Sequence, residues 1–193
     1  MKFLSGFLTA LLILVVATAA AVLSGSFNTA ASVPAGAFEK RVATLALDRS
    51  VARRAPKASN PLKPSPDVLK DGLAHYKEMC VICHGAPGVD ATEVGEGLNP
   101  PAPDLTLAKV QKRSDGELYW IVQNGIRMTG MPAFGVTHKE DQLWRIVTFV
   151  RHLPELKPEE QKVLKSVEAE EHGHGEAEEH HHEGEASEQH HDH

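Results

Sequence analysis

The sequence predicts an all-helical domain that lies between an N-terminal transmembrane helix and a disordered C-terminal tail. Three segments in the middle of the chain repeat apolar residues every three or four positions, and no stretch shows the alternation of apolar and polar residues that strands require. A long apolar run opens the chain, and residues 167–193 hold ten Asp or Glu residues, eight His residues and no Lys or Arg. The helical domain is therefore flanked by two segments of very different chemistry.

Composition divides the 193 residues into four segments. We expect an anchor at residues 1–23, a linker at 24–65, one folded domain at 66–155 and the tail at 156–193. A typical domain has roughly 100 to 150 residues, so the chain has room for one folded unit with attachments.

The N-terminal apolar run, Phe3 to Leu23, is uncharged and contains 21 residues. As a helix it would measure about 32 Å, close to the hydrocarbon thickness of a bilayer. A cleaved signal peptide is the alternative, because Ala17-Thr18-Ala19 has the small residues of a cleavage site. The run is longer than the roughly 7 to 15 apolar residues of such peptides, so we favour an uncleaved anchor.

The linker is rich in Ala, Ser, Pro and basic residues, and its prolines keep its last part extended. Within it, Phe38, Val42 and Leu45 have helical spacing beside the basic segment Lys40 to Lys57. Two interpretations stay open: a short amphipathic helix that lies on a membrane surface or contacts a partner, and a solvated linker with fluctuating helix.

Three helices are predicted in the folded region. The first begins near Ser65-Pro66, where a capping hydroxyl precedes a proline at the first helical position. The second begins with the capping-box pattern Ser114-Asp115-Gly116-Glu117 and stops at Gly125. The third repeats that pattern at Thr137-His138-Lys139-Glu140 and ends before Pro154.

The motif that carries chemistry is Cys80-Val81-Ile82-Cys83-His84, a C-x-x-C-H run typical of c-type haem attachment. Each cysteine sulfur can add to one haem vinyl group, and the adjacent imidazole can bind the iron. A redox-active dithiol would need a strand before the motif, and a structural zinc site would need further ligands that a chain with two cysteines supplies only from distant histidines. We therefore predict one covalent haem, bound through Cys80, Cys83 and His84.

Three further segments resemble the small bacterial monohaem cytochromes c of class I. Gly72-Leu73-Ala74-His75-Tyr76-Lys77-Glu78-Met79-Cys80 resembles their opening helix, Thr129-Gly130-Met131-Pro132-Ala133-Phe134-Gly135 their distal-ligand loop, and Leu143 to Arg151 their closing helix. The resemblance implies a cytochrome c-like helical domain around one haem. It also implies that Gly72 and Tyr76 pack against Trp144 or Phe149.

By the same resemblance, Met131 is the sixth iron ligand, and a thioether favours ferrous iron and raises the reduction potential. Met128 and His138 are the alternative ligands, and an open five-coordinate iron is a third possibility. A ligating histidine usually gives its other ring hydrogen to a carbonyl. The segment Ala102-Pro103-Asp104-Leu105 resembles the one that supplies this carbonyl, which makes Pro103 the expected acceptor for His84.

The tail has too few apolar residues to offset the entropy of ordering, so we expect it to be disordered. Its imidazoles suit zinc, copper and nickel, which they could bind loosely. The alternative is a solubilising acidic segment, or one that steers a basic partner. The histidines in question are His172, His174, His180, His181, His182, His190, His191 and His193.

The combined features predict single-electron transfer between respiratory redox partners by a cytochrome tethered to the bacterial inner membrane. Haem attachment of this kind is, by the resemblance, extracytoplasmic, so the haem domain should face the periplasm. We expect an electron carrier rather than an enzyme, with redox proteins or a respiratory complex as partners, the membrane bound through the N-terminal helix, and no nucleic acid. The alternatives are a haem subunit fixed in a larger oxidoreductase, docked through Lys40 to Lys57, and a periplasmic metal-binding or haem sensor protein.

Overall fold

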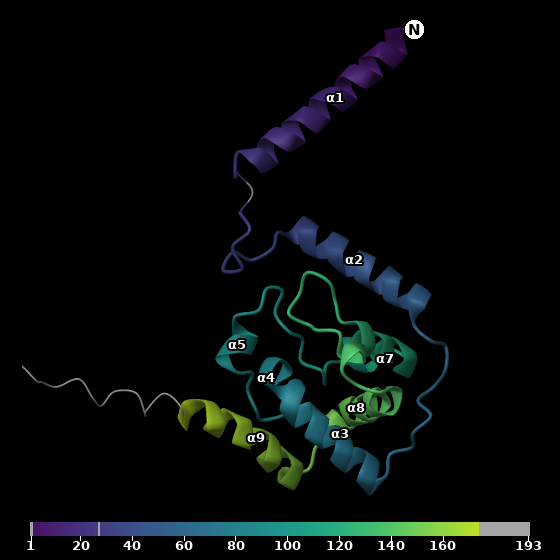
Figure 1. Ribbon diagram of the computed structural model, residues 1–193, viewed down its shortest axis with the longest axis vertical. Coiled ribbons are helices and arrows are strands. Elements are labelled where there is room, and N and C mark those ends of the chain that lie inside the picture. The colour runs from purple at the N-terminus through teal and green to yellow at the C-terminus, as the bar shows by residue number, and fades with distance from the viewer. Residues whose placement is uncertain (1, 27, 174–193) are drawn as a thin grey trace, which may run out of the picture.

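The computed structural model describes residues 2–26 and 28–173 (Figure 1). Within these ranges every regular element is helical, and the only strand-like pairing is an isolated bridge between Ala86 and Val89, which confirms the all-helical prediction. The elements are α1 (Lys2–Leu23), α2 (Ala37–Arg54), α3 (Pro66–Met79), α4 (Val81–His84), α5 (Glu93–Glu96), α6 (Ala108–Gln111), α7 (Asp115–Asn124), η1 (Phe134–Val136), α8 (Glu140–His152), η2 (Leu153–Glu155) and α9 (Pro158–Gly173).

The core is built on the crossing of α3 and α8. A Cβ atom on Gly72 would lie 2.7 Å from the Arg145 carbonyl oxygen and 2.7 Å from the Phe149 Cβ, so only a glycine lets the two backbones approach this closely. The Tyr76 ring packs on Phe149 with centroids 5.3 Å apart. Of the two partners that the resemblance implied, Phe149 is therefore the correct one.

The second predicted partner, Trp144, has a different role. It stacks on Tyr119 of α7 with ring centroids 4.2 Å apart, so it joins α8 to α7 rather than to α3. A contiguous cluster of buried apolar side chains runs through α3, α4, α7, α8 and α9 and includes Cys80 of the C-x-x-C-H motif. The motif is therefore built onto the core of the domain.

Two of the three predicted helix starts are confirmed. The Ser65 hydroxyl accepts a hydrogen bond from Val68 N, and Ser114 and Glu117 form a reciprocal capping box. The predicted Thr137 cap was wrong, because α8 begins later, with Lys139 as its N-cap residue. Thr137 instead ends η1, where its backbone N–H donates to the Phe134 carbonyl.

The predicted tail boundary at residue 156 was also wrong, because α9 occupies residues 158–173. Leu164 is fully buried in the core cluster, and the Gln161 amide donates to the Pro87 carbonyl at 2.5 Å. His152 and Glu160 join α8 to α9 through a hydrogen bond of 2.9 Å. Acidic composition favoured disorder, but a few apolar side chains on one face of this helix are enough for packing against α3 and α4.

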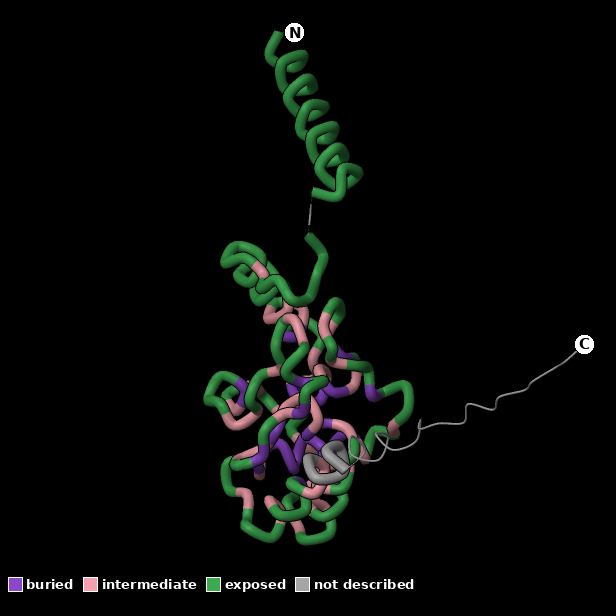
Figure 2. Tube along the Cα trace, turned by 90° about the vertical axis from the view of Figure 1, so that its left-hand side faces the viewer, coloured by how far each residue is buried: buried purple, intermediate pink, exposed green. Residues whose placement is uncertain are grey.

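The N-terminal region consists of two separate helices (Figure 1). All of α1 is exposed, as Figure 2 shows, and it is long and apolar enough to cross a bilayer, which supports membrane anchoring. The predicted linker contains an ordered helix, since α2 spans 18 residues and packs on α7. The solvated-linker alternative is therefore wrong for residues 37–54.

Candidate haem-binding site

The C-x-x-C-H motif forms a single helical turn at the end of α3. Cys80 caps both helices, and its carbonyl accepts hydrogen bonds from the backbone N–H groups of Cys83, at 3.1 Å, and His84, at 2.9 Å. Gly85 ends the turn with φ of 58°, and a Cβ there would lie 2.6 Å from the Val89 carbonyl oxygen. The two sulfurs are therefore one turn apart, with the imidazole immediately after them.

The two cysteines are free thiols here, standing where thioether sulfurs would be in a haem-bound protein. Burial raises the pKa of Cys80 to about 12 and also raises the pKa of Cys83. Thiolates are the reactive and zinc-binding form, so these neutral thiols do not support a dithiol redox centre. Within the described part of the chain no three His, Cys, Asp or Glu side chains gather as a metal site would require.

His84 is oriented by a backbone carbonyl. Its Nδ1 lies 2.8 Å from the Pro103 carbonyl oxygen, and because a carbonyl only accepts, Nδ1 carries the hydrogen. Burial lowers the pKa of His84, although the hydrogen bond to Pro103 partly opposes that effect. The imidazole is thus neutral, with its lone pair on Nε2, which is the form that binds a metal.

Two polar contacts stabilise the motif, and neither is indicated by a sequence pattern. The buried Tyr76 hydroxyl donates to the Gly85 carbonyl at 2.6 Å, and the Thr92 hydroxyl donates to the Ile82 carbonyl at 3.0 Å. Thr92 is one of the buried polar residues of the domain. Its role depends on the path of the intervening loop, and no pattern in the sequence indicates that path.

The loop between α7 and η1 carries the two methionines that were considered as the distal ligand. Met131 is half-buried against the core cluster, whereas Met128 is 90 % exposed and has a φ of 59°. The Thr129 hydroxyl donates to the Ile126 carbonyl at 2.7 Å and accepts from Met131 N at 3.1 Å. This local network holds Met131 at the core and leaves Met128 at the loop tip, which favours Met131 as the ligand.

His138, the other alternative ligand, is engaged elsewhere. Its Nδ1 lies 2.8 Å from the Thr137 hydroxyl, and its ring packs edge-on against His75, with centroids 5.4 Å apart, and against Phe134. His75 and His138 therefore form a histidine contact on the surface of α3.

The predicted metal-binding histidines of the tail lie almost entirely outside the described residues. His172 belongs to α9, but its side chain is not described. The other seven lie beyond residue 173, outside the described part of the chain: His174, His180, His181, His182, His190, His191 and His193.

The donor set fits a covalently bound haem. Two neutral thiols on one turn suit thioether formation, and an oriented neutral imidazole follows them directly. Residues 67–150 match the family model described as cytochrome C oxidase, cbb3-type, subunit III. No curated protein matches the chain at a significant level. The matched segment begins one residue into α3 and ends within α8, so it contains the motif, the Pro103 carbonyl and the methionine loop.

Proposed function

We propose that this membrane-anchored chain, whose residues 67–150 form a c-type cytochrome domain, transfers single electrons between respiratory redox partners on the periplasmic side of the bacterial inner membrane. The family match supports electron transfer and covalently bound haem c in general. The partners, the compartment and the single haem are our proposal. The observation that carries it is the orientation of His84, which directly follows Cys83 in the chain. Its Nδ1 donates a hydrogen bond of 2.8 Å to the Pro103 carbonyl.

Four side chains would hold the cofactor. Cys80 and Cys83 would form the thioether bonds, and His84 and Met131 would be the protein ligands of the iron. When bound, haem c supplies a one-electron couple that needs no substrate at the metal. Pro103 keeps the imidazole in the tautomer that leaves Nε2 unprotonated, and Tyr76 and Thr92 stabilise the turn that carries the thiols.

The proposed ligand pair favours an electron carrier over an enzyme. If His84 and Met131 both bind the iron, no substrate would bind there, and a methionine ligand would raise the reduction potential relative to a second histidine. Cys80 and Val81 lie in the buried apolar cluster and Ile82 packs against it, so this side of the motif would limit water access, which also raises the reduction potential.

Optical spectroscopy of the full-length holoprotein tests the ligand set. Met131→Ala should abolish the weak far-red absorption band of methionine-ligated ferric haem, while the matched control Met128→Ala should retain it, because Met128 is exposed at the loop tip. An intact mass measured on the same samples reports how many haems are attached and whether α1 is retained. Survival of the band in Met131→Ala would move the ligand to another residue.

A second candidate function is that of a haem subunit fixed in a larger oxidoreductase. The description of the matched family names an oxidase subunit, which favours this alternative. Purification in a mild detergent distinguishes the two functions. A carrier should be extracted from the membrane without partner proteins, whereas a subunit should co-purify with the other oxidoreductase subunits in fixed stoichiometry. Ready binding of carbon monoxide to the reduced protein would favour a haem sensor over both.

Loose binding of zinc, copper or nickel by the histidine-rich tail stays a separate proposal. A truncation that tests it should end after Gly173 rather than inside α9, because Leu164 is part of the core. Calorimetry should then show that the truncated protein binds zinc and copper more weakly than the full chain does. Equal affinities would contradict metal binding by the tail.

A further inference from the structure

One face of α2 attaches this helix to the haem domain. Val51 is fully buried, and Asp48 pairs with Arg113 at 2.5 Å. Just before α2, the Asn99 side-chain amide donates to the carbonyls of Ala31 and Val33, each at 2.9 Å. The helix and the segment that leads into it are therefore both tied to the domain, at two separated places.

The opposite face of α2 has no cover. At 100° per residue, Phe38, Val42, Leu45, Arg49 and Arg53 lie on the side away from Val51. All five are exposed, and Phe38 is 82 % exposed, which is unusual for an aromatic side chain. Figure 2 shows most of α2 in the colour of exposed residues. This outer face of α2 is apolar over its first turns and basic over its last turns.

The charges on α2 suit an anionic partner. The helix contains five basic residues and two acidic ones, Glu39 and Asp48, which gives a net charge of +3. Asp48 is already neutralised by Arg113, and Glu39 lies at the edge of the outer face. An exposed aromatic and aliphatic patch can bury its side chains at the boundary between lipid headgroups and acyl chains, and arginines beside it are attracted to anionic headgroups.

The position of α2 in the chain keeps it close to the bilayer. Only residues 24–36 separate it from the end of α1, and 13 residues span at most about 47 Å even when fully extended. Figure 1 shows α2 between α1 and the body of the domain. With α1 in the membrane, α2 is the first helix outside it.

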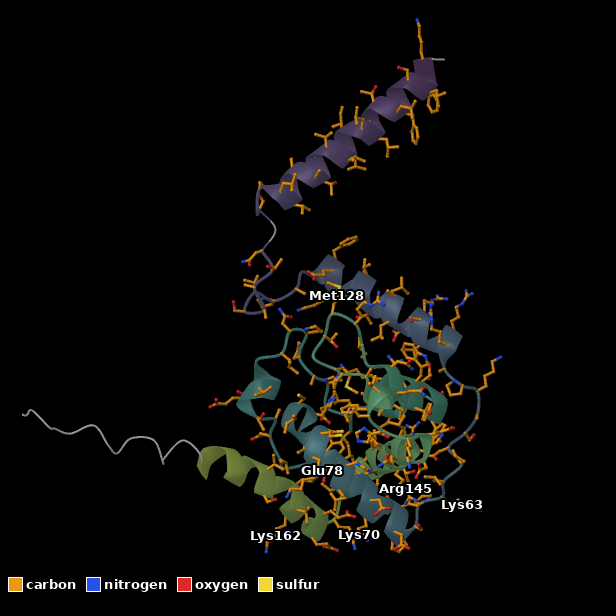
Figure 3. All side chains as sticks on the ribbon, in the orientation of Figure 1. Lys63, Lys70, Glu78, Met128, Arg145 and Lys162 are labelled. Carbon is orange, nitrogen blue, oxygen red and sulfur yellow. The ribbon has the colours of Figure 1, made fainter. Side chains whose placement is uncertain are left out.

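We propose that the outer face of α2 lies on the surface of an anionic bilayer, so that the haem domain, docked on the other face of α2, is held in one orientation rather than swinging on a tether. The proposal rests on the anchoring role of α1 in the proposed function. The side of the domain away from α2 then faces the periplasm and is open to redox partners. The Met128 loop tip, which Figure 3 shows at the end of the domain toward α2, would then lie on the membrane side.

Spin labelling of the full-length holoprotein in lipid nanodiscs tests this. The native cysteines are consumed by haem attachment, so Val42→Cys gives one reactive thiol on the outer face of α2. Val94→Cys on α5, where Val94 is 63 % exposed, is the matched control. In discs of phosphatidylglycerol and phosphatidylcholine, the label at residue 42 should be accessible to oxygen and protected from a water-soluble nickel chelate. The label at residue 94 should remain accessible to the chelate.

Charge reversal adds a second readout. A basic residue near an anionic surface favours contact roughly five-fold, so losing two arginines lowers the contact equilibrium by about 25-fold, and the two added carboxylates lower it further. Arg49→Glu combined with Arg53→Glu should return the label at residue 42 to water, as should discs of phosphatidylcholine alone. Lys70→Glu with Lys162→Glu, at the end of the domain opposite α2 in Figure 3, should have no such effect.

A label at residue 42 that is accessible to the nickel chelate in both lipids, with the haem spectrum intact, would overturn the membrane contact and leave the electron-transfer proposal standing. Immobilisation of that label only after addition of an acidic redox protein would also overturn it and assign the face to protein docking. If the unmodified protein carries no covalent haem, the proposed function is refuted, regardless of what the outer face of α2 contacts.

Discussion

Gly72→Ala tests the close crossing of α3 and α8 on which the haem domain is built. The added Cβ would lie 2.7 Å from the Arg145 carbonyl oxygen and from the Phe149 Cβ, and ordinary contact begins near 3.4 Å. The two helices must therefore separate by about 0.7 Å, because both contacted atoms belong to stiff parts of α8 and cannot rotate away.

The expected cost follows from two opposing effects. Overpacking a dense core costs about 1–3 kcal/mol, and replacing a glycine inside a helix by alanine returns about 1 kcal/mol. The rigid contacts place the overpacking cost in the upper part of its range. We therefore expect a net loss of about 1–2 kcal/mol, which lowers the melting temperature by roughly 5–15 °C for a domain of this size. Circular dichroism at increasing temperature, measured on the holoprotein, gives this value.

Gly97→Ala is the matched control. Gly97 has helical dihedral angles, with φ of −73° and ψ of −4°, and an added Cβ would lie 3.4 Å from the Glu93 carbonyl oxygen, which is ordinary contact. This variant should be neutral or stabilised by about 0.4–1 kcal/mol, because alanine restricts the unfolded chain. A Gly72→Ala protein as stable as the unmodified one would refute the close approach of the helices.

Two further predictions concern α9. Leu164→Ala should cost about 2–5 kcal/mol of unfolding free energy in chemical denaturation, whereas Val163→Ala, at a position 42 % exposed, should change it by less than about 0.5 kcal/mol. For Glu160, burial alone would raise the pKa, but hydrogen bonds from the Lys157 backbone N–H and from His152 outweigh it and lower the pKa below its ordinary 4.5. The ionised Glu160 carboxylate therefore stabilises the folded protein fully above pH 4.5. This stabilisation is lost as the pH falls through the lowered pKa of Glu160. Glu160→Gln should lower stability at neutral pH and flatten this acid-side decline.

Equal losses for Leu164→Ala and Val163→Ala would show that α9 does not join the core. An acid-side decline that is unchanged in Glu160→Gln would remove the contact with His152 as its cause. Both outcomes can be read from denaturation curves at several pH values.

The parts of the site that depend on neighbouring residues in the chain were predictable. Two sulfurs and an imidazole in five consecutive residues form a donor set in any helical turn, and the Ser114 cap is satisfied by a residue three positions later. The Pro103 carbonyl was expected only from a resemblance, since its hydrogen bond to His84 spans 19 residues of irregular loop. Thr92 went unnoticed for the same reason.

The sequence by itself determined the helical class, the apolar anchor and the haem-attachment motif, because each is written in local spacing and composition. Only the tertiary structure decided which methionine is held at the core, since Met131 and Met128 differ in surroundings rather than in chemistry. It also decided that Leu164 is buried and that α2 has one docked and one bare face. Burial is a property of what else packs nearby, and that depends on contacts between residues far apart in the chain.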